Sequence, residues 1–183
     1  CPKELERFRV QKGFCALAVC LISKDERGVT VSYHVLVAGA AGYIGSAVCH
    51  VLVERGYSVV GIDTLQQGHR DALPDEVSLF QGDILDGVTL ERLFLRYPID
   101  AVIHLAAVSV VGESVRDPRV YFHNNVVGTL ALLEAMLKFG VLRMVFSSSA
   151  AVYGIPELSP IPEAHPIRPV NPYGATKAAM EAA

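Results

Sequence analysis

Tyr173 and Lys177 are the residues of this 183-residue chain whose types and spacing point most directly to acid–base chemistry. Four positions apart on a helix, they share one face, because about 3.6 residues make one turn. An ammonium group beside a phenol favours the phenolate, both through its charge and through hydrogen bonds. The pair therefore predicts a tyrosine that acts as a general base and a lysine that activates it. Taken alone the spacing is weak, since helices carry such pairs by chance.

A glycine-rich segment supplies a second chemical feature, a site for phosphate groups. The apolar run His34–Ala38 predicts a buried strand. Gly39, Gly42 and Gly45 follow it, and apolar residues then recur at helical spacing until Gly56. Glycines at such a turn let backbone amides approach a pyrophosphate, and the helix N-terminus adds partial positive charge. Strand, glycines and helix in this order predict a dinucleotide-binding turn.

Asp63 ends the next apolar run, residues 58–62, and completes the nucleotide pattern. A carboxylate at the tip of the second strand can accept hydrogen bonds from ribose hydroxyls. The same negative charge repels a 2′-phosphate, so the sequence favours NAD over NADP. Arg70 could in principle restore NADP binding, but a solvated surface arginine is the simpler interpretation.

Alternating strands and helices must position these residues. Further strands are predicted over 77–81, 101–105 and 142–146, a short helix over 87–95, and a long helix from Asp117 to Gly140. This alternation predicts an α/β fold, a Rossmann-like doubly wound parallel sheet with ligands at the carboxyl ends of the strands. Ala106 and Ala107 follow the fourth strand, and their small side chains let a cofactor lie against the backbone.

Composition limits the classes of partner. With 16 basic and 19 acidic residues and a net charge of −3, the chain gives no reason to expect nucleic acid or a membrane surface. An apolar content of 51% with 19% charged residues suits a parallel sheet buried on both faces. The 4 cysteines lack the spacing of metal ligands, so no metal is expected, and a reduced, cytoplasmic location is the inference.

Three other features have structural interpretations. His104 lies in an apolar run, where a single histidine is more often a packed core residue than a catalytic one. The run Ser147–Ser149 is not flanked by the glycines of a nucleophile elbow, so no serine nucleophile is expected. Leu130, Leu133 and Met136 recur at helical spacing and predict core or subunit-interface positions.

Five segments together resemble the extended short-chain dehydrogenases/reductases, and within them the NAD-dependent epimerase/dehydratase family. They are GAAGYIGS at 39–46, VGES at 111–114, YFHNN at 121–125 with Gly128-Thr129, FSSSAAVYG at 146–154, and PYGATK at 172–177. The resemblance covers about residues 34–183. It implies a tightly held NAD, a UDP-sugar substrate and a homodimer of the complete protein.

The resemblance also implies roles for individual residues. Tyr173 corresponds to the catalytic base, Lys177 to its activator and ligand of the nicotinamide ribose, and Ser149 to the hydroxyl bonded to O4 of the sugar. The cofactor-binding residues it implies are Gly39, Gly42, Tyr43, Ile44, Gly45, Asp63, Gln67, Asp83, Ile84, Leu105, Ala106, Ala107, Ser109, Asn124 and Ser147, together with Tyr173 and Lys177.

The reaction that the resemblance implies is epimerisation at C4 of a UDP-hexose, UDP-glucose or UDP-galactose, by transient oxidation to a 4-keto sugar and return of the hydride. Related 4,6-dehydratases carry an Asp-Glu pair where this chain has Ala150 and Ala151, so dehydration is not expected. Ser109 stands where many epimerases have lysine, which leaves the sugar open. UDP-arabinose and UDP-glucuronate therefore remain alternatives, as does a non-catalytic NAD-binding module.

The two ends of the chain carry separate expectations. Residues 1–33 are predicted to be a leader of uncertain origin outside the fold, and residues 34–183 an NAD-binding Rossmann domain. The resemblance implies a further strand and a carboxyl-terminal substrate domain, so we expect a chain truncated before that domain. The isolated chain is accordingly expected to show little or no turnover.

Overall fold

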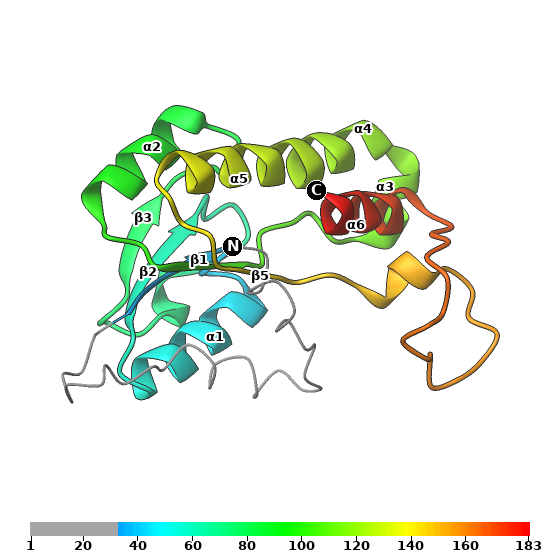
Figure 1. The fold of residues 1–183 in the computed structure, drawn as a ribbon, viewed down its shortest axis with the longest axis horizontal. Coiled ribbons are helices and arrows are strands. Elements are labelled where there is room, and N and C mark those ends of the chain that lie inside the picture. Colours follow the sequence, from blue (N-terminus) through cyan, green and yellow to red (C-terminus); the bar gives the residue numbers. More distant parts are fainter. Residues whose placement is uncertain (1–32) are drawn as a thin grey trace, which may run out of the picture.

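Five parallel strands form one sheet in the order β3-β2-β1-β4-β5 (Figure 1). The computed structural model describes residues 33–183, so the predicted leader lies, apart from Tyr33, outside the described residues. The strands are β1 (His34–Ala38), β2 (Ser58–Asp63), β3 (Ser78–Gln81), β4 (Ala101–His104) and β5 (Met144–Phe146). The strand order reverses between β1 and β4, which is where the following loops diverge and open a crevice. The predicted doubly wound parallel sheet is confirmed.

Helices cover both faces of this sheet. They are α1 (Tyr43–Glu54), α2 (Gly87–Arg96), α3 (Val111–Arg116), α4 (Pro118–Tyr121), the π-helical segment η4 (Phe122–Val127), α5 (Gly128–Lys138) and α6 (Pro172–Ala182). Short 3₁₀ turns occur at η3 (Arg70–Ala72) and η5 (Ala150–Tyr153). Figure 1 shows α1 on one side of the sheet and α2, α5 and α6 on the other.

The core follows the alternation of side chains along the strands. In β1, Val35 and Val37 pack with α1, whereas Leu36 packs on the other face with Leu90 of α2 and Leu132 of α5. All five of these side chains are buried. Successive strand residues point to opposite faces, so apolar residues at every position are what a sheet covered on both sides requires.

The predicted elements are largely confirmed, with three corrections. The strand predicted over 142–146 begins only at Met144, because its register with β4 starts at the pair Val102–Met144 and Leu142 is exposed. The short helix α3 was not predicted. The long helix predicted from Asp117 is continuous but changes to the wider π-helical turn at η4. Within residues 33–183, no helix combines the length and apolar character needed to cross a membrane.

Candidate cofactor and catalytic site

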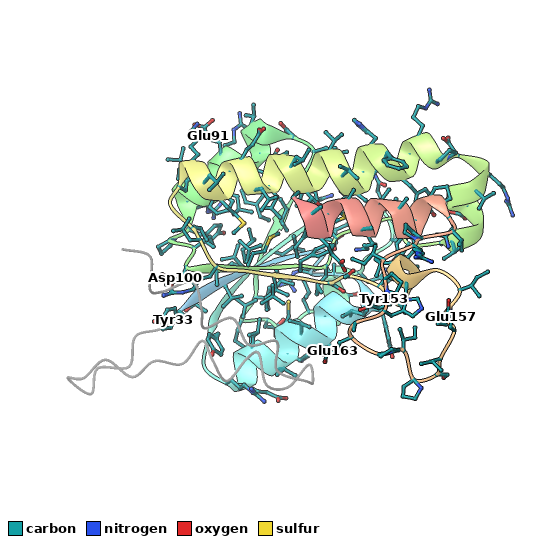
Figure 2. The ribbon with its side chains drawn as sticks, turned by 45° about the vertical axis from the view of Figure 1, so that its right-hand side comes forward. Tyr33, Glu91, Asp100, Tyr153, Glu157 and Glu163 are labelled. Carbon is teal, nitrogen blue, oxygen red and sulfur yellow. The ribbon has the colours of Figure 1, made fainter. Side chains whose placement is uncertain are left out.

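A cleft of about 240 Å³ opens at the carboxyl ends of β1 to β4. It is lined by ten of the residues predicted to bind the cofactor: Gly39, Gly42, Asp63, Gln67, Asp83, Ile84, Leu105, Ala106, Ala107 and Asn124. The amino ends of the strands lie at the opposite end of the molecule, where Figure 2 shows Tyr33 and Asp100, while Tyr153 lies beyond the carboxyl end of β5. The cleft thus occupies the edge of the sheet where ligands of doubly wound folds bind.

The three glycines of the turn after β1 have different reasons to be glycine. Gly39 has a φ of +82°, and a Cβ there would lie 2.7 Å from the Ala106 backbone nitrogen. A Cβ on Gly45 would lie 2.0 Å from the Gly39 carbonyl oxygen. Both glycines are therefore required by the fold itself. Among the described residues, a Cβ on Gly42 would meet only the Gly39 oxygen, at 3.5 Å, so this part of the fold leaves the space beside Gly42 free.

Asp63 holds the glycine turn in addition to facing the cleft. One of its carboxylate oxygens accepts from the Ala41 backbone N–H and the other from the Leu65 backbone N–H, both at 2.9 Å. The second bond accompanies a positive φ of 60° at Leu65, a conformation that non-glycine residues rarely adopt. Each carboxylate oxygen can accept more than one hydrogen bond. Asp63 can therefore brace the turn and still accept a hydrogen bond from a ribose hydroxyl.

Seven residues predicted to bind the cofactor do not line the cleft; two of them, Tyr173 and Lys177, lie on α6. Tyr43 and Ile44 lie at the start of α1 and are 96% and 51% exposed. Gly45 is buried inside the turn, Ser109 is exposed on the loop after β4, and Ser147 follows β5 beside Lys177. Sequence reasoning missed five lining residues, Ile62, Thr64, Gln66, Gly68 and Gly82. Most of these adjoin a predicted site residue, and that proximity was the available signal.

Helix α6 brings Tyr173 and Lys177 to the same edge of the sheet. Asn171 caps it, since its side chain accepts from the Gly174 N–H at 2.8 Å, and Pro172 occupies the first turn. A Cβ on Gly174 would lie 2.4 Å from the Ala151 carbonyl oxygen. Glycine at this position therefore lets the helix pack closely against η5.

Lys177 is a buried amine with a backbone partner. It is 3% exposed, and its Nζ donates to the Ser147 carbonyl oxygen at 2.9 Å. Its ammonium also lies 4.9 Å from the ring centroid of Phe146 and 5.9 Å from that of Tyr173. Burial lowers the pKa of Lys177 to about 8, so the amine is still mostly protonated at neutral pH. The predicted Tyr–Lys pairing on one helix face is thus present.

Ser149, two residues after this lysine's backbone partner, and Tyr173 of α6 are both half-buried. The Ser149 hydroxyl accepts from the Ala151 N–H at 3.2 Å as the cap of η5, which leaves its own proton available to a ligand. The Tyr173 ring stands edge-on to that of Tyr121, with 6.5 Å between the centroids. Ser148 bonds instead to Glu181 of α6. The three predicted catalytic residues therefore lie in neighbouring segments at one edge.

His104 is a core residue, as predicted. It is fully buried, and its Nε2 lies 2.8 Å from the Thr129 Oγ1. The Thr129 hydroxyl gives its only proton to the Asn125 carbonyl oxygen at 2.6 Å, so His104 must donate from Nε2. Its Nδ1 has no hydrogen-bond partner among the described residues. Burial, with a smaller contribution from the charge of Lys177, lowers the pKa of His104 to about 4, so the ring is neutral.

Asn125 is a buried residue of the site that sequence reasoning did not single out. It is fully buried at the junction of η4, the loop after β4, and α6. Its neighbour Asn124 was predicted instead, and this side chain lines the cleft while donating to the Val120 carbonyl oxygen. Within residues 33–183, the structure has no group of three or more His, Cys, Asp or Glu side chains that could hold a metal ion.

Known proteins share both the sequence and the fold. The UDP-glucose 4-epimerase of Halalkalibacterium halodurans is 51% identical over 147 residues, which are 80% of this chain and 44% of that protein. The solved UDP-glucose 4-epimerase of Brucella ovis, in complex with NAD, is 44% identical with a TM-score of 0.80, covering 82% of this chain and 46% of that one. The enzyme of Bifidobacterium longum, in complex with NAD⁺ and UDP, is 39% identical with a TM-score of 0.79, over 81% and 47%.

The chain thus spans less than half the length of these relatives. The family whose sequence pattern matches is described as the NAD dependent epimerase/dehydratase family, and the match runs over residues 35–183. Except for His34, the first residue of β1, that range includes all the strands of the sheet, the glycine turn and the helix that bears Tyr173 and Lys177. The chain therefore belongs to the NAD dependent epimerase/dehydratase family.

Proposed function

We propose that the protein binds NAD in the cleft and, as a complete protein, epimerises C4 of a UDP-hexose. One observation carries the proposal: a buried amine, a phenol and a serine hydroxyl lie at the same edge of the sheet as a glycine turn with free space beside Gly42. The relatives from B. ovis and B. longum bind NAD, which supports the choice of cofactor. We further propose residues 34–183 as the NAD-binding domain.

The residues of the cleft fit a dinucleotide. The space beside Gly42 lets a pyrophosphate approach the backbone, and the N-terminus of α1 favours its negative charge. The Asp63 carboxylate would accept hydrogen bonds from the hydroxyls of the adenosine ribose. Asp83 and Ile84 would flank the adenine, and the small residues after β4 would leave room for the nicotinamide.

Bound NAD would supply the hydride acceptor and donor that the chain itself lacks. The chain's own residues would handle the proton and the charge. Tyr173, as phenolate, would take the proton from the 4-hydroxyl and return it after the 4-keto sugar has turned over in the site. Lys177, fixed on the Ser147 carbonyl, would stabilise the phenolate through its charge, and Ser149 would donate a hydrogen bond to the sugar O4.

The catalytic half of the proposal is tested by Tyr173→Phe in the complete protein. We expect interconversion of UDP-glucose and UDP-galactose to be abolished while NAD stays bound, because only the acid–base hydroxyl is lost. Assays with UDP-arabinose and UDP-galacturonate in parallel decide the sugar. Tyr153→Phe is the matched control, because Tyr153 lies in η5 with its ring against His165, 5.7 Å between centroids. Full activity of Tyr173→Phe would refute the assignment of the base.

The cofactor half is tested by Gly42→Ala. The added methyl fits the fold but fills the space proposed for the pyrophosphate, so we expect NAD affinity to fall about tenfold or more, roughly the loss of one good hydrogen bond. Unfolding free energy should stay close to that of the wild type. Equal NAD binding by Gly42→Ala and wild type, measured by calorimetry, would place the cofactor elsewhere.

The same proposal includes a homodimer and a reduced, cytoplasmic setting. Side chains exposed along α4, η4 and α5 provide an apolar surface for the second copy: Val120, Phe122, Val127, Leu130 and Leu137. Met136 of the same helix is buried in the core, so the predicted helical stripe divides between core and surface. The mass of the complete protein in solution, compared with that of Leu130→Glu, tests the dimer, and imaging of a tagged protein tests the location.

A further inference from the structure

A buried chain of hydrogen bonds connects the floor of the cleft with the helix that bears Tyr173 and Lys177. It runs from Val108, which lines the cleft, through Asn125 of η4 to Thr176 of α6. Asn125 and Thr176 are both fully buried. Buried polar side chains are stable only when their hydrogen bonds are satisfied, so each bond of this chain constrains the segments that it joins.

Asn125 has all its strong donors engaged and its orientation fixed. Its Oδ1 accepts from the Val108 N–H at 2.9 Å, and its Nδ2 donates to the Val108 carbonyl oxygen at 3.1 Å. The second Nδ2 proton goes to the Thr176 Oγ1 at 3.0 Å. Because Val108 presents both a donor and an acceptor, only one orientation of the amide satisfies all three contacts. The bonded pair Val108–Asn125 therefore offers α6 a donor with a fixed direction.

Thr176 completes the chain on the helix side. Its hydroxyl donates to the Tyr173 carbonyl oxygen, 2.7 Å away and one turn earlier, and accepts from Asn125. The residue that follows it is Lys177, whose amine is bonded to the Ser147 carbonyl oxygen, in the segment after β5. Two buried side chains, adjacent in sequence, thus tether α6 to two different segments. Together they fix the rotation of α6 about its axis and its position along that axis, and therefore the placement of Tyr173 and Lys177.

We propose that Thr176 is a positioning residue, which holds α6 on Asn125 so that Tyr173 and Lys177 face the ligands of the cleft. The role rests on the proposed epimerase function, because it matters for catalysis only if Tyr173 is the base. Thr176 touches none of the reacting groups itself. It acts through the backbone of Tyr173, and the Asn125–Val108 pair couples the helix to the loop on the nicotinamide side.

The experiment compares Thr176→Val with Thr176→Ser in the complete protein loaded with NAD. Valine keeps the shape of the side chain and loses the hydroxyl, whereas serine keeps the hydroxyl and loses a methyl group. For Thr176→Val we expect kcat to fall about 10- to 100-fold with little change in KM, because a misplacement of about 1 Å has effects of that size. Thr176→Ser should recover most of the lost kcat. Thr89→Val, which removes a hydroxyl bonded to Asp86 at the start of α2, should leave kcat at the wild-type value.

Amide hydrogen exchange supplies a measurement that does not depend on turnover. Thr176→Val should raise exchange in α6 selectively, with β1 and β4 still protected as in the wild type. Equal exchange and kcat in Thr176→Val and wild type would overturn the proposal. So would a defect in Thr176→Ser that matches Thr176→Val, or a uniform rise of exchange over the whole sheet. Absence of turnover in the wild type refutes the proposed function, while the exchange pattern alone still decides whether Thr176 holds α6.

Discussion

The glycine turn after β1 and the helix α6 meet at one edge of the sheet, but they are held in place by different means. Around Gly39 and Gly45 the contacts are backbone against backbone, so close that no Cβ fits. Around α6 they are side-chain hydrogen bonds, from Asn125 to Thr176 and from Lys177 to the Ser147 carbonyl. Asp63 adds a side-chain brace to the turn, and Gly174 adds a close backbone contact to α6. The turn nevertheless depends mainly on the absence of side chains, and the helix mainly on the presence of particular ones.

This difference separates two kinds of vulnerability. A region built from backbone contacts fails by overpacking when a glycine gains a side chain. A region built from buried polar groups fails when one partner is removed and the other is left unsatisfied. Substitutions and pH changes should therefore act on the two regions in different ways, and four measurements test that expectation.

The largest effect is expected from Gly45→Ala. Its Cβ would lie 2.0 Å from one backbone oxygen and 2.8 Å from another, so the turn must move. We expect a loss of about 4 kcal/mol of unfolding free energy, at the upper end for single substitutions. Gly112→Ala is the control, since a Cβ there meets no atom of the described residues within 4 Å. It should stabilise α3 by about 0.5–1 kcal/mol. Similar urea midpoints for the two variants would contradict the backbone-built turn.

Acidification should act on the region of α6 through His104. The pKa of this buried ring is about 4 in the folded chain, against an ordinary value of 6.5. Between these values the unfolded chain binds the proton and the folded chain does not, so stability falls as pH drops from 6.5 to 4. The loss should reach about 3 kcal/mol near pH 4. The variant His104→Gln keeps an N–H donor but does not titrate, so its unfolding free energy should fall less between pH 6.5 and pH 4. Parallel pH curves for variant and wild type would show that His104 is not responsible.

A smaller effect is expected from Asp63→Ala, which tests a side chain that braces the glycine turn. The substitution removes the acceptor for the N–H groups of Ala41 and Leu65. We expect a loss of about 2 kcal/mol, measured by urea unfolding, together with weaker NAD binding. Asp75→Ala, at an exposed position, should change stability by less than about 0.5 kcal/mol. If both variants unfold alike, Asp63 contributes nothing to the turn.

The smallest effect is expected from Tyr121→Phe. The hydroxyl of Tyr121 donates to the Val110 carbonyl oxygen at 2.6 Å, and its ring packs edge-on against Tyr173. Phenylalanine keeps the ring contact and loses the hydrogen bond, so we expect a loss of about 1 kcal/mol. Thermal unfolding measures it. A loss as large as that of Gly45→Ala would mean that α6 is held mainly by this contact, against the role given to Thr176.

The sequence predicted the backbone-built region better than the side-chain-built one. Gly39, Gly45 and Asp63 were identified from local order along the chain, because a strand, a glycine turn and a helix lie within one segment. Asn125 looks like any polar residue of a long helix. Its importance arises from Val108 and Thr176, which lie 17 and 51 residues away along the chain, and such pairings leave no local pattern.

The π-helical segment η4 was missed for the same reason. Its six residues have no helix-breaking glycine or proline, and the hydroxyl of Thr129 bonds back to the Asn125 carbonyl oxygen within it. Thr129 is itself hydrogen-bonded to His104, and this bond connects α5 with strand β4 of the sheet. Widened turns of this kind are frequent at functional sites, but they follow from tertiary contacts that a single sequence does not display.

Cys49 offers a way to follow the opening of the molecule in time. It is the free cysteine of the described residues, fully buried between α1 and β1, and burial raises the pKa of its thiol to about 12. A thiol alkylates only as the exposed thiolate, so labelling of Cys49, identified by peptide mass, must wait until this layer separates. The rate at which Cys49 is alkylated therefore measures how often α1, the helix that begins at the glycine turn, detaches from the sheet. A lower rate in the presence of NAD would report cofactor binding without any assay of turnover.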